Sequence, residues 1–378
     1  MVRPGRWIRL QAMRKDGSSL NGLLSSCVSW GSRRGADLPR QGCLPVTRVS
    51  VTVRSPAKIN WFLRVLGRRQ DGFHDIRSLL SAITLYDELA LASRDTSGIE
   101  LVCDHPDLPT DHRNLIVKAG KLLAEAAGIE PRATCRLRKE IPIGGGLGGG
   151  SSNGAASLVA FNRLWGLDWS VEQLAPLAAK LGSDVPFFLR GGSAVISGRG
   201  ERIRPVRLQW EGWIVLIFPP FGVSTAEVYG AWRPPASPPA PTLLDEMPAG
   251  VDVLRLDSRQ LMAAAYNMLE QPLLLVRPQV GPLLDMLKRL AGRPVRVSGS
   301  GSTLFTAYDN YAEAMGFARR VEDETGMRAR LAQLGKPGVW EADSAAGEAF
   351  EPGEASPREC LGCFREDRQL EGGRDGNH

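Results

Sequence analysis

Short alternations of apolar and polar residues predict most of the strands in this chain. Val49, Val51 and Val53 alternate with polar residues, as in a strand that buries one face. An Asp71-Gly72 turn signal separates two further apolar stretches. The segments predicted as strands are residues 49–53, 58–66, 76–91, 134–137 and 213–218, with strand pairs over 191–203 and 295–307.

Elsewhere the apolar residues recur at helical spacing. Gly128 is a natural stop for the first such segment, and Ser170 with Gln173 three residues later is a capping signal for the third. The predicted helices cover residues 114–127, 151–165, 170–181, 258–267, 280–290 and 312–325. Strands and helices are mixed without strict βαβ alternation. The pattern therefore predicts an α+β fold in two lobes rather than a doubly wound parallel sheet.

Both ends of the chain and one internal stretch lack this periodicity. Residues 234–241 contain five prolines and predict a loop or linker. Residues 336–378 are acidic, Gly-rich and poor in apolar residues, which is typical of a disordered tail. Residues 1–47 mix Arg, Ser and Gly, so an organelle transit peptide or a disordered extension (with Met13 as an alternative start) both fit. We favour the extension.

The net charge of +6 does not indicate a basic surface on the folded body. Nine Arg or Lys but only two Asp fall within residues 1–50, so the remainder is close to neutral and nucleic-acid binding loses support. No apolar run approaches the roughly 20 residues of a membrane span. The six cysteines are scattered, unlike a disulfide scaffold, and the lone Cys360-Cys363 pair lacks the other ligands of a metal site.

A glycine-rich run that opens directly onto a predicted helix is the strongest chemical signal. Six glycines in seven residues disfavour a strand or helix interior, because ordering glycine costs the most conformational entropy. Bare N–H groups that lead into a helix N-terminus form a phosphate site. The residues assigned to nucleotide phosphates are Pro142, Ile143, Gly144, Gly145, Gly146, Leu147, Gly148, Gly149, Gly150, Ser151 and Ser152.

Other glycine motifs fit this run less well. A P-loop ends in Gly-Lys-Ser/Thr, and no Lys follows here. A dinucleotide fingerprint requires an acidic residue about 20 positions on, at the end of a second strand. Asp168 has the distance but follows the end of a predicted helix. A flexible linker would not be followed at once by a helix, so the run indicates phosphate binding.

Two charged side chains stand in unusual surroundings. Lys58 begins an apolar strand segment, where a buried ammonium is costly unless it is paired, although a solvated Lys at a strand edge explains it equally well. Asp184 precedes a Pro and two Phe. Helix capping is the ordinary explanation for such an Asp, and a general base with Lys58 as its neighbouring cation is the chemical one. Residues 297–302 form a second glycine loop, which suggests a cleft closed from the other lobe.

These four segments, in this order, resemble the GHMP kinase superfamily, named for galactokinase, homoserine, mevalonate and phosphomevalonate kinases. Within it, the sequences Pro-Ala-Lys-Ile-Asn at 56–60 and Gly-Arg-Arg-Gln-Asp-Gly-Phe-His at 67–74 are similar to the 4-diphosphocytidyl-2-C-methyl-D-erythritol kinases of the non-mevalonate isoprenoid route. Residues 182–188, 191–192, 198–201 and 298–302 also match that family. The resemblance covers about residues 50–335 and neither tail.

The resemblance implies a two-lobed GHMP kinase fold. Its ATP-binding lobe, residues 48–208, would be ribosomal-protein-S5-domain-2-like, and residues 209–335 would form a ferredoxin-like α/β sandwich. Asp184 would take the proton from the C2 hydroxyl of a cytidyl diphosphate substrate, and Lys58 would pair with Asp184 and orient that hydroxyl. Mg²⁺ would bridge the ATP phosphates, with no metal site of the protein's own. The residues implied on the substrate side are Asn60, Phe73, His74 and, more loosely, Thr225.

One of these positions departs from the family. Many members have Tyr where this chain has Phe73, so a ring remains to stack on cytosine but any hydrogen bond from the hydroxyl is lost.

Several alternatives stay open on the sequence. If the chain were a homoserine or mevalonate kinase, the Asp-Gly-Phe-His segment at 71–74 would have no explanation. The presence of both Lys58 and Asp184 argues against a non-catalytic nucleotide-binding regulator. A nicotinamide oxidoreductase would use the glycines for pyrophosphate. The expected partner is a small-molecule substrate, with neither nucleic acid nor membrane, and the expected state is monomer or homodimer. A bacterial cytoplasm fits best, and a plastid is the alternative if residues 1–50 are a transit peptide.

Overall fold

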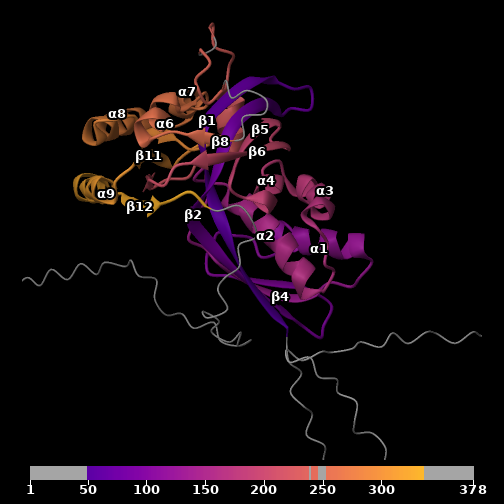
Figure 1. Ribbon diagram of the computed structural model, residues 1–378. Helices are drawn as coiled ribbons and strands as arrows, with labels where there is room; N and C mark the ends of the chain where they lie inside the picture. The colour runs from indigo at the N-terminus through magenta and orange to yellow at the C-terminus, as the bar shows by residue number, and fades with distance from the viewer. Residues whose placement is uncertain (1–48, 238–239, 246–252, 336–378) are drawn as a thin grey trace, which may run out of the picture. The chain divides into compact units, whose positions relative to one another are not determined.

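A computed structural model describes residues 49–237, 240–245 and 253–335 (Figure 1). The extension expected at 1–47, the tail expected at 336–378 and the Cys360-Cys363 pair lie outside these ranges. Of the cysteines in the described ranges, Cys103 and Cys135 are free thiols. No helix in the described part of the chain is both long and apolar enough to cross a membrane.

The larger of two sheets has β2 at its centre. β2 pairs antiparallel with β1, β4 and β5, and the path across the sheet is β3-β4-β2-β5-β6-β8, with β1 bridging β2 to β9. β3 and β4 run parallel and are connected through α1. The strands are β1 (Ser50–Arg68), β2 (His74–Ser93), β3 (Gly98–Cys103), β4 (Arg132–Arg138), β5 (Ser193–Gly198), β6 (Arg202–Gln209), β8 (Val253–Arg255) and β9 (Tyr266–Asn267).

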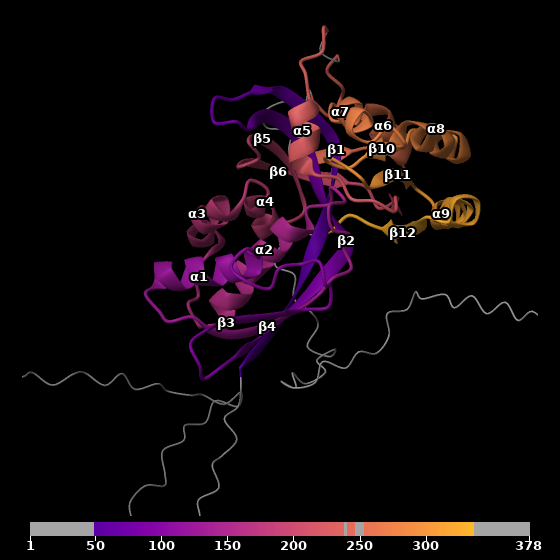
Figure 2. The ribbon, with the colours of Figure 1, turned by 180° about the vertical axis from the view of Figure 1, so that it is seen from behind.

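Four helices gather on one face of this sheet, as both views show (Figures 1 and 2). α2 lies innermost: it packs against β1 and β2, and twelve of its residues are buried, including Phe161. These helices are α1 (Leu115–Ala127), α2 (Gly149–Leu164), α3 (Val171–Leu181) and α4 (Val185–Arg190).

The second sheet has four antiparallel strands in the order β10-β11-β7-β12. β11 and the four inner residues of β7, which form its central pair, are buried, because these strands are almost entirely apolar. The strands are β7 (Trp213–Phe218), β10 (Arg296–Val297), β11 (Leu304–Tyr308) and β12 (Arg328–Ala332). The helices of this half are α5 (Thr225–Ala231), α6 (Ser258–Ala264), α7 (Glu270–Val276), α8 (Val280–Ala291) and α9 (Tyr311–Thr325).

The strongly periodic segments form the elements that their pattern predicts. α1 is capped by Asn114 and ends at Gly128 in the left-handed conformation, and α3 begins with the Ser170–Gln173 capping box. The strand pairs expected over 191–203 and 295–307 are present as β5–β6 and β10–β11. The α+β prediction, with two lobes, is confirmed.

The helix expected over residues 258–267 was wrong at its end. α6 ends at Ala264, Ala265 is extended, and residues 266–267 form β9 against β1. Tertiary pairing outweighs helix propensity there, because the Asn267 side chain bonds to the backbone of a distant loop. The sequence also missed β3, β8, β12, α4, α5 and α7.

Candidate active site

The glycine-rich run connects β4 to α2 and forms a loop that only glycine permits. Gly146 and Gly148 have φ of 73° and 71°, and a Cβ at Gly146 would overlap the carbonyl oxygen of Ser298. Gly148 is the N-cap of α2 and has no side chain to satisfy the first-turn N–H groups. The N-terminus of α2 is therefore uncapped and free to bind an anion.

Lys58 and Asn60 lie on β1 between two irregularities in the strand. The pairing of β1 with β2 shifts register at Pro56/Ala57 and again at Asn60/Phe62. Such bulges redirect side chains, and they occur frequently beside active sites. The backbone N–H of Lys58 donates to Leu147 O at 2.9 Å, so this part of β1 is attached to the glycine loop.

The Lys58 ammonium is buried against that loop, with a side chain that is 4% exposed. It donates to Asn60 Oδ1 and to Gly146 O, both at 2.6 Å. Burial lowers its pKa to about 8, and the negative charge of Asp184 opposes that shift. The amine is therefore still mostly protonated at neutral pH.

Asp184 occupies the N-cap position of α4, yet its side chain makes no capping hydrogen bond. The ordinary structural explanation for an Asp at this position thus does not apply. Lys58 and Asp184 interact electrostatically, but within the described residues no ion pair of 4.0 Å or less joins them. The direct pairing expected from the sequence is not seen, although both side chains line the same cleft.

A cleft of about 930 Å³ contains nearly all the residues singled out in the sequence. This volume lies at the upper end of the usual range for small-molecule sites. From that set the cleft is lined by Lys58, Asn60, Phe73, His74, Pro142, Ile143, Gly144, Gly145, Gly146, Leu147, Gly148, Gly149, Gly150, Ser151, Asp184 and Thr225.

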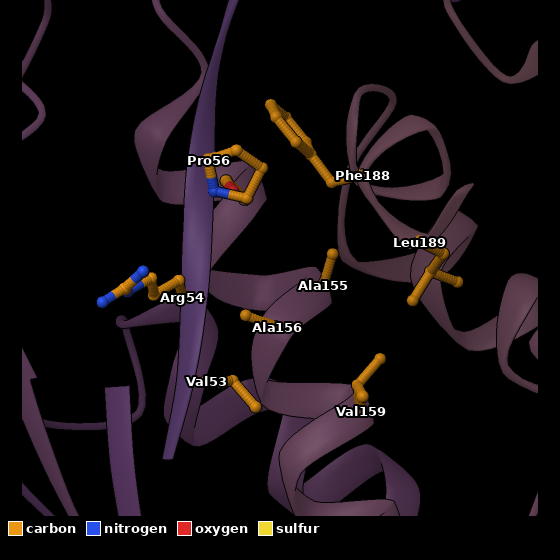
Figure 3. Close-up of a pocket in the computed structure, with 9 residues that line it drawn as sticks. Val53, Arg54, Pro56, Ala155, Ala156, Val159, Phe188 and Leu189 are labelled. Atoms are coloured by element: carbon orange, nitrogen blue, oxygen red, sulfur yellow. The ribbon is translucent and has the colours of Figure 1, made fainter. Parts of the chain in front are cut away.

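Ser152 is the exception. It is fully buried and lines a separate small apolar pocket, and its hydroxyl has no hydrogen-bond partner among the described residues. Figure 3 shows this pocket between the β1 residues Val53 and Pro56, the α2 alanines and Phe188 of α4, with the Arg54 guanidinium directed away. Ser152 directly follows Ser151, but consecutive helical residues point in different directions, so the Ser152 hydroxyl faces the small pocket instead of the cleft.

The cleft is strongly asymmetric in charge. Among the described residues that line it, Asp184 is the single carboxylate. The cationic side chains that face it are Lys58, Arg68, Arg113, Lys139 and Arg199. An arrangement of this kind favours anionic ligands and supplies one group able to accept a proton.

Aromatic side chains form another wall of the cleft. The His74 ring lies 5.1 Å from Tyr229 and 5.5 Å from Trp232, measured between centroids, and Arg199 lies 4.9 Å over the Phe73 ring. Burial, and then the charge of Arg68, lower the pKa of His74, so its imidazole is mostly neutral at pH 7.

The sequence analysis missed Arg68, Arg199 and Tyr229 as cleft residues. For Tyr229 a signal was present, since Ser224 and Glu227 have the spacing of a capping box and Ser224 does cap α5.

The second glycine loop, residues 298–302, comes from the C-terminal half of the chain and closes the cleft from that side. Thr303 N donates to Gly145 O at 3.1 Å, and Ser298 Oγ donates to Gly146 O at 3.2 Å. The hydroxyls of Thr225 and Ser300 lie 2.9 Å apart. This loop therefore contacts both the first glycine loop and α5; the sequence suggested closure of the cleft from the other lobe but not the contact with α5.

Comparison with known proteins identifies the family. The model of the GHMP kinase N-terminal domain matches residues 114–192, which include the glycine loop and Asp184. The 4-diphosphocytidyl-2-C-methyl-D-erythritol kinase of Bacillus thuringiensis (strain Al Hakam) is 37% identical over 262 residues, covering 69% of this chain and 88% of the relative. That of Synechococcus sp. (strain JA-3-3Ab) is 41% identical over 260 residues, covering 67% and 84%. This chain belongs to the 4-diphosphocytidyl-2-C-methyl-D-erythritol kinases.

Solved structures agree with membership of this kinase family. A crystal structure of 4-(cytidine 5'-diphospho)-2C-methyl-D-erythritol kinase aligns with a TM-score of 0.62 and 31% identity, covering 76% of this chain and all of the other. Homoserine kinase from Cytophaga hutchinsonii aligns with a TM-score of 0.59 at 19% identity, covering 80% of this chain and all of the other, which shows the shared fold alone. The two-lobed GHMP kinase fold is thus confirmed.

Proposed function

We propose that this chain transfers the γ-phosphoryl group of ATP to the C2 hydroxyl of 4-diphosphocytidyl-2-C-methyl-D-erythritol. The products are the 2-phosphate and ADP, and the reaction is a step of the non-mevalonate route to isoprenoid precursors. The observation that carries the proposal is the cleft itself, in which Asp184 is the lone carboxylate among the described lining residues, with cations around it and an uncapped helix N-terminus beside it. A triphosphate donor and a diphosphate-bearing acceptor are both anionic, so a site that binds them requires positively charged side chains.

ATP is assigned to the glycine-loop side of the cleft. The α- to γ-phosphates lie along the loop and the first turn of α2, where backbone N–H groups and the Ser151 hydroxyl donate hydrogen bonds. Lys139, whose side chain lies by Gly149, adds a cation at the same end. Ser152 takes no part, because its hydroxyl lies in the separate apolar pocket.

Mg²⁺ fits this site as a partner of the nucleotide rather than of the protein. The described lining of the cleft offers a single carboxylate, so phosphate oxygens would supply most of the ligands of the ion. When bound, it would neutralise charge on the transferred phosphoryl group.

Asp184 is assigned the role of general base. Its carboxylate accepts the proton of the C2 hydroxyl as that oxygen forms a bond to the γ-phosphorus. The bond between the γ-phosphorus and the bridging oxygen breaks, and ADP leaves with the electron pair. The absence of a capping bond leaves the Asp184 carboxylate available for this proton.

Lys58 is assigned the role of stabilising the negative charge that develops between the ATP γ-phosphoryl group and the acceptor oxygen. Gly146 O and Asn60 Oδ1 hold its ammonium from two directions. The third N–H is left for the acceptor oxygen or for the γ-phosphoryl group. A preorganised cation in a site with little water is the kind of group that stabilises phosphoryl transfer.

The aromatic wall is assigned to the cytidine half of the acceptor. A neutral His74 can both donate and accept hydrogen bonds, and Phe73 and Tyr229 offer ring faces for stacking. Asn60, which accepts a hydrogen bond from Lys58, and Thr225, whose hydroxyl contacts Ser300, line the same cleft. Homoserine and mevalonate lack a nucleobase, so neither substrate would use the wall.

The proposed division of labour follows the two halves of the chain. Residues 48–208 would form the ATP-binding domain, and residues 209–335 would contribute α5 and the second glycine loop on the acceptor side. The relatives come from bacteria, which supports the expected site of action in a bacterial cytoplasm.

The proposal is tested by incubating the full chain with ATP and Mg²⁺ and a panel of alcohols. The panel contains the cytidyl-methylerythritol substrate, homoserine and mevalonate. ADP release measures turnover, and ³¹P NMR of the product locates the new phosphate. We expect turnover of the cytidyl substrate alone. Phosphorylation of homoserine or mevalonate instead, or ATP binding with no turnover of any alcohol, would refute the proposal.

Asp184→Asn should lower kcat by at least about 100-fold, the low end for loss of a general base, while ATP binding persists. Its matched control is Asp257→Ala, because Asp257 is also a helix N-cap but does cap its helix, through Gln260 N at 2.8 Å. We expect Asp257→Ala to lose about 1 kcal/mol of stability with kcat unchanged. Near-wild-type turnover by Asp184→Asn would exclude Asp184 as the base.

A further inference from the structure

Asn267 holds the second glycine loop from behind. It lies on β9 beside β1 and is 7% exposed, outside the lining of the cleft. Its Nδ2 donates to Gly299 O at 2.7 Å and to Val297 O at 3.0 Å, while its Oδ1 accepts from Leu269 N at 2.9 Å. Both N–H donors and the carbonyl oxygen of this buried amide are thus engaged with backbone.

The backbone held in this way lies beside the Lys58 ammonium. A Cβ at Gly299 would lie 3.0 Å from Lys58 Nζ and 2.9 Å from Gly146 O, the carbonyl that accepts the Lys58 hydrogen bond. Gly299 has a φ of 58°, which favours glycine. A shift of the Gly299 backbone away from the cleft would therefore open space around Lys58 and its acceptor, Gly146 O.

We infer that Asn267 is a positioning residue for the reaction and fixes Lys58 through the second glycine loop without touching either substrate. The inference rests on the proposed function, because it assigns Asn267 a part in that same phosphoryl transfer. The route is short: the Asn267 amide holds Gly299, and Gly299 encloses Lys58 and its acceptor, Gly146 O.

Asn267→Asp is the most direct test, because it keeps the size of the side chain and removes both N–H donors. A carboxylate would then face the Val297 and Gly299 carbonyl oxygens, and the loop would move away from it. A misplacement of about 1 Å at a reacting group can cost about 100-fold in rate. We expect kcat to fall by about ten- to a hundredfold in Asn267→Asp and in Asn267→Ala, with smaller changes in KM for ATP and for the acceptor.

Asn162 provides the matched control. It is 8% exposed, and its side chain also bridges backbone, donating to Trp169 O and accepting from Trp169 N at 3.0 Å each. It lies near the end of α2, outside the lining of the cleft. Asn162→Asp and Asn162→Ala should cost comparable stability, yet kcat per folded molecule should stay within about twofold of wild type.

A second readout does not depend on turnover. In protein labelled at lysine ¹³Cε, the Lys58 signal is assigned with Lys58→Arg, and its titration is followed by NMR. Loosening the loop admits water to the ammonium, so the titration midpoint should rise toward that of an ordinary lysine in the Asn267 variants and stay unchanged in the Asn162 variants.

Each outcome decides between the inference and a purely structural role. Asn267 variants that match the Asn162 variants in kcat and in the Lys58 titration would overturn the inference. Wild type without turnover of the cytidyl substrate would refute the proposed function, while the titration would still decide the role of Asn267. If Asn267→Asp does not fold, Gly299→Ala tests the same contact, and wild-type kcat in that variant would overturn the inference.

Discussion

Lys58 is the residue at which burial and charge oppose each other most clearly. Its pKa falls from 10.5 to about 8 because burial penalises the ammonium, and the attraction of Asp184 offsets part of that loss. The amine therefore loses its proton within the range over which an enzyme is ordinarily assayed. A residue proposed to act as a cation thus becomes visible in a pH profile.

We expect kcat to fall as pH rises, with a midpoint near about 8, because the neutral amine no longer offsets phosphoryl charge. Lys58→Arg keeps its charge at every practical pH, so this descending limb should disappear, at a lower kcat because the guanidinium has a different shape. The measurement is kcat from about pH 6 to about pH 10 at saturating substrates. A rate that rises through pH 8 would mean instead that the neutral amine is the active form.

At the scale of single residues, the sequence predicted as site residues those side chains whose chemical type is unusual for their surroundings. Lys58 and Asp184 were found because a charge beside apolar residues needs an explanation, and the structure places both in the cleft. The absence of a direct ion pair between Lys58 and Asp184 was not predicted, because the distance between two side chains depends on how the elements that hold them pack. Ser152 was assigned by adjacency to Ser151, but consecutive residues on a helix point in different directions.

The glycine loop keeps its shape because both of its ends attach to one buried carboxylate, Asp87 of β2. Asp87 Oδ1 accepts from the backbone N–H groups of Glu140 and Ile141 at 2.8 and 2.9 Å, just before the loop. Its Oδ2 accepts from Lys139 Nζ and, at 2.8 Å, from Asn153 Nδ2, just after the loop. Strand, loop and helix are thereby fixed as one unit.

Asp87→Asn should raise KM for ATP by about tenfold and leave KM for the acceptor nearly unchanged. The amide of the new Asn would place N–H groups against the Lys139 ammonium and the Asn153 amide, so the ends of the glycine loop would no longer be held. Breaking this buried pair should also cost about 3–5 kcal/mol of stability. Asp245→Asn is the control, because Asp245 is buried against Arg64 and Tyr266 outside the lining of the cleft. Steady-state kinetics and thermal unfolding of both variants provide the test. Equal KM values for ATP in the two would contradict it.

Elements with strong local signals were predictable, and elements made by tertiary contacts were not. β7 was predicted with its observed ends, and α9 begins one residue before its prediction. β9 is two residues long and exists through its pairing with β1, so no local pattern announces it. α4 has six residues and begins at the Asp-Val-Pro segment, too short for periodicity to be read.

At the scale of the molecule, clusters of buried apolar residues span both sheets. Trp61 of β1 is fully buried and packs edge-on against Trp210 at 5.7 Å and against Phe305 of β11 at 5.8 Å, measured between ring centroids. The same cluster contains Ile59 of β1 and Leu216 of β7. The sequence indicated two lobes but not these shared clusters, because side-chain alternation gives the buried face of a strand without its partner.

Trp61→Ala should therefore destabilise both halves of the molecule together, by about 3–5 kcal/mol, since truncation of a buried aromatic leaves a cavity that neither sheet fills. Hydrogen exchange followed by mass spectrometry resolves the halves, with peptides from β4 and α1 reporting on one and peptides from β12 and α9 on the other. We expect protection to fall by a similar free energy in all four elements, because unfolding either sheet exposes the core of the other. Val117→Ala is the control: it lies on α1, is 3% exposed and does not belong to the cluster of buried residues that contains Trp61. If Trp61→Ala lowers protection in β4 and α1 while β12 and α9 keep wild-type values, the two halves unfold independently, and their boundary near residue 209 separates two autonomous domains.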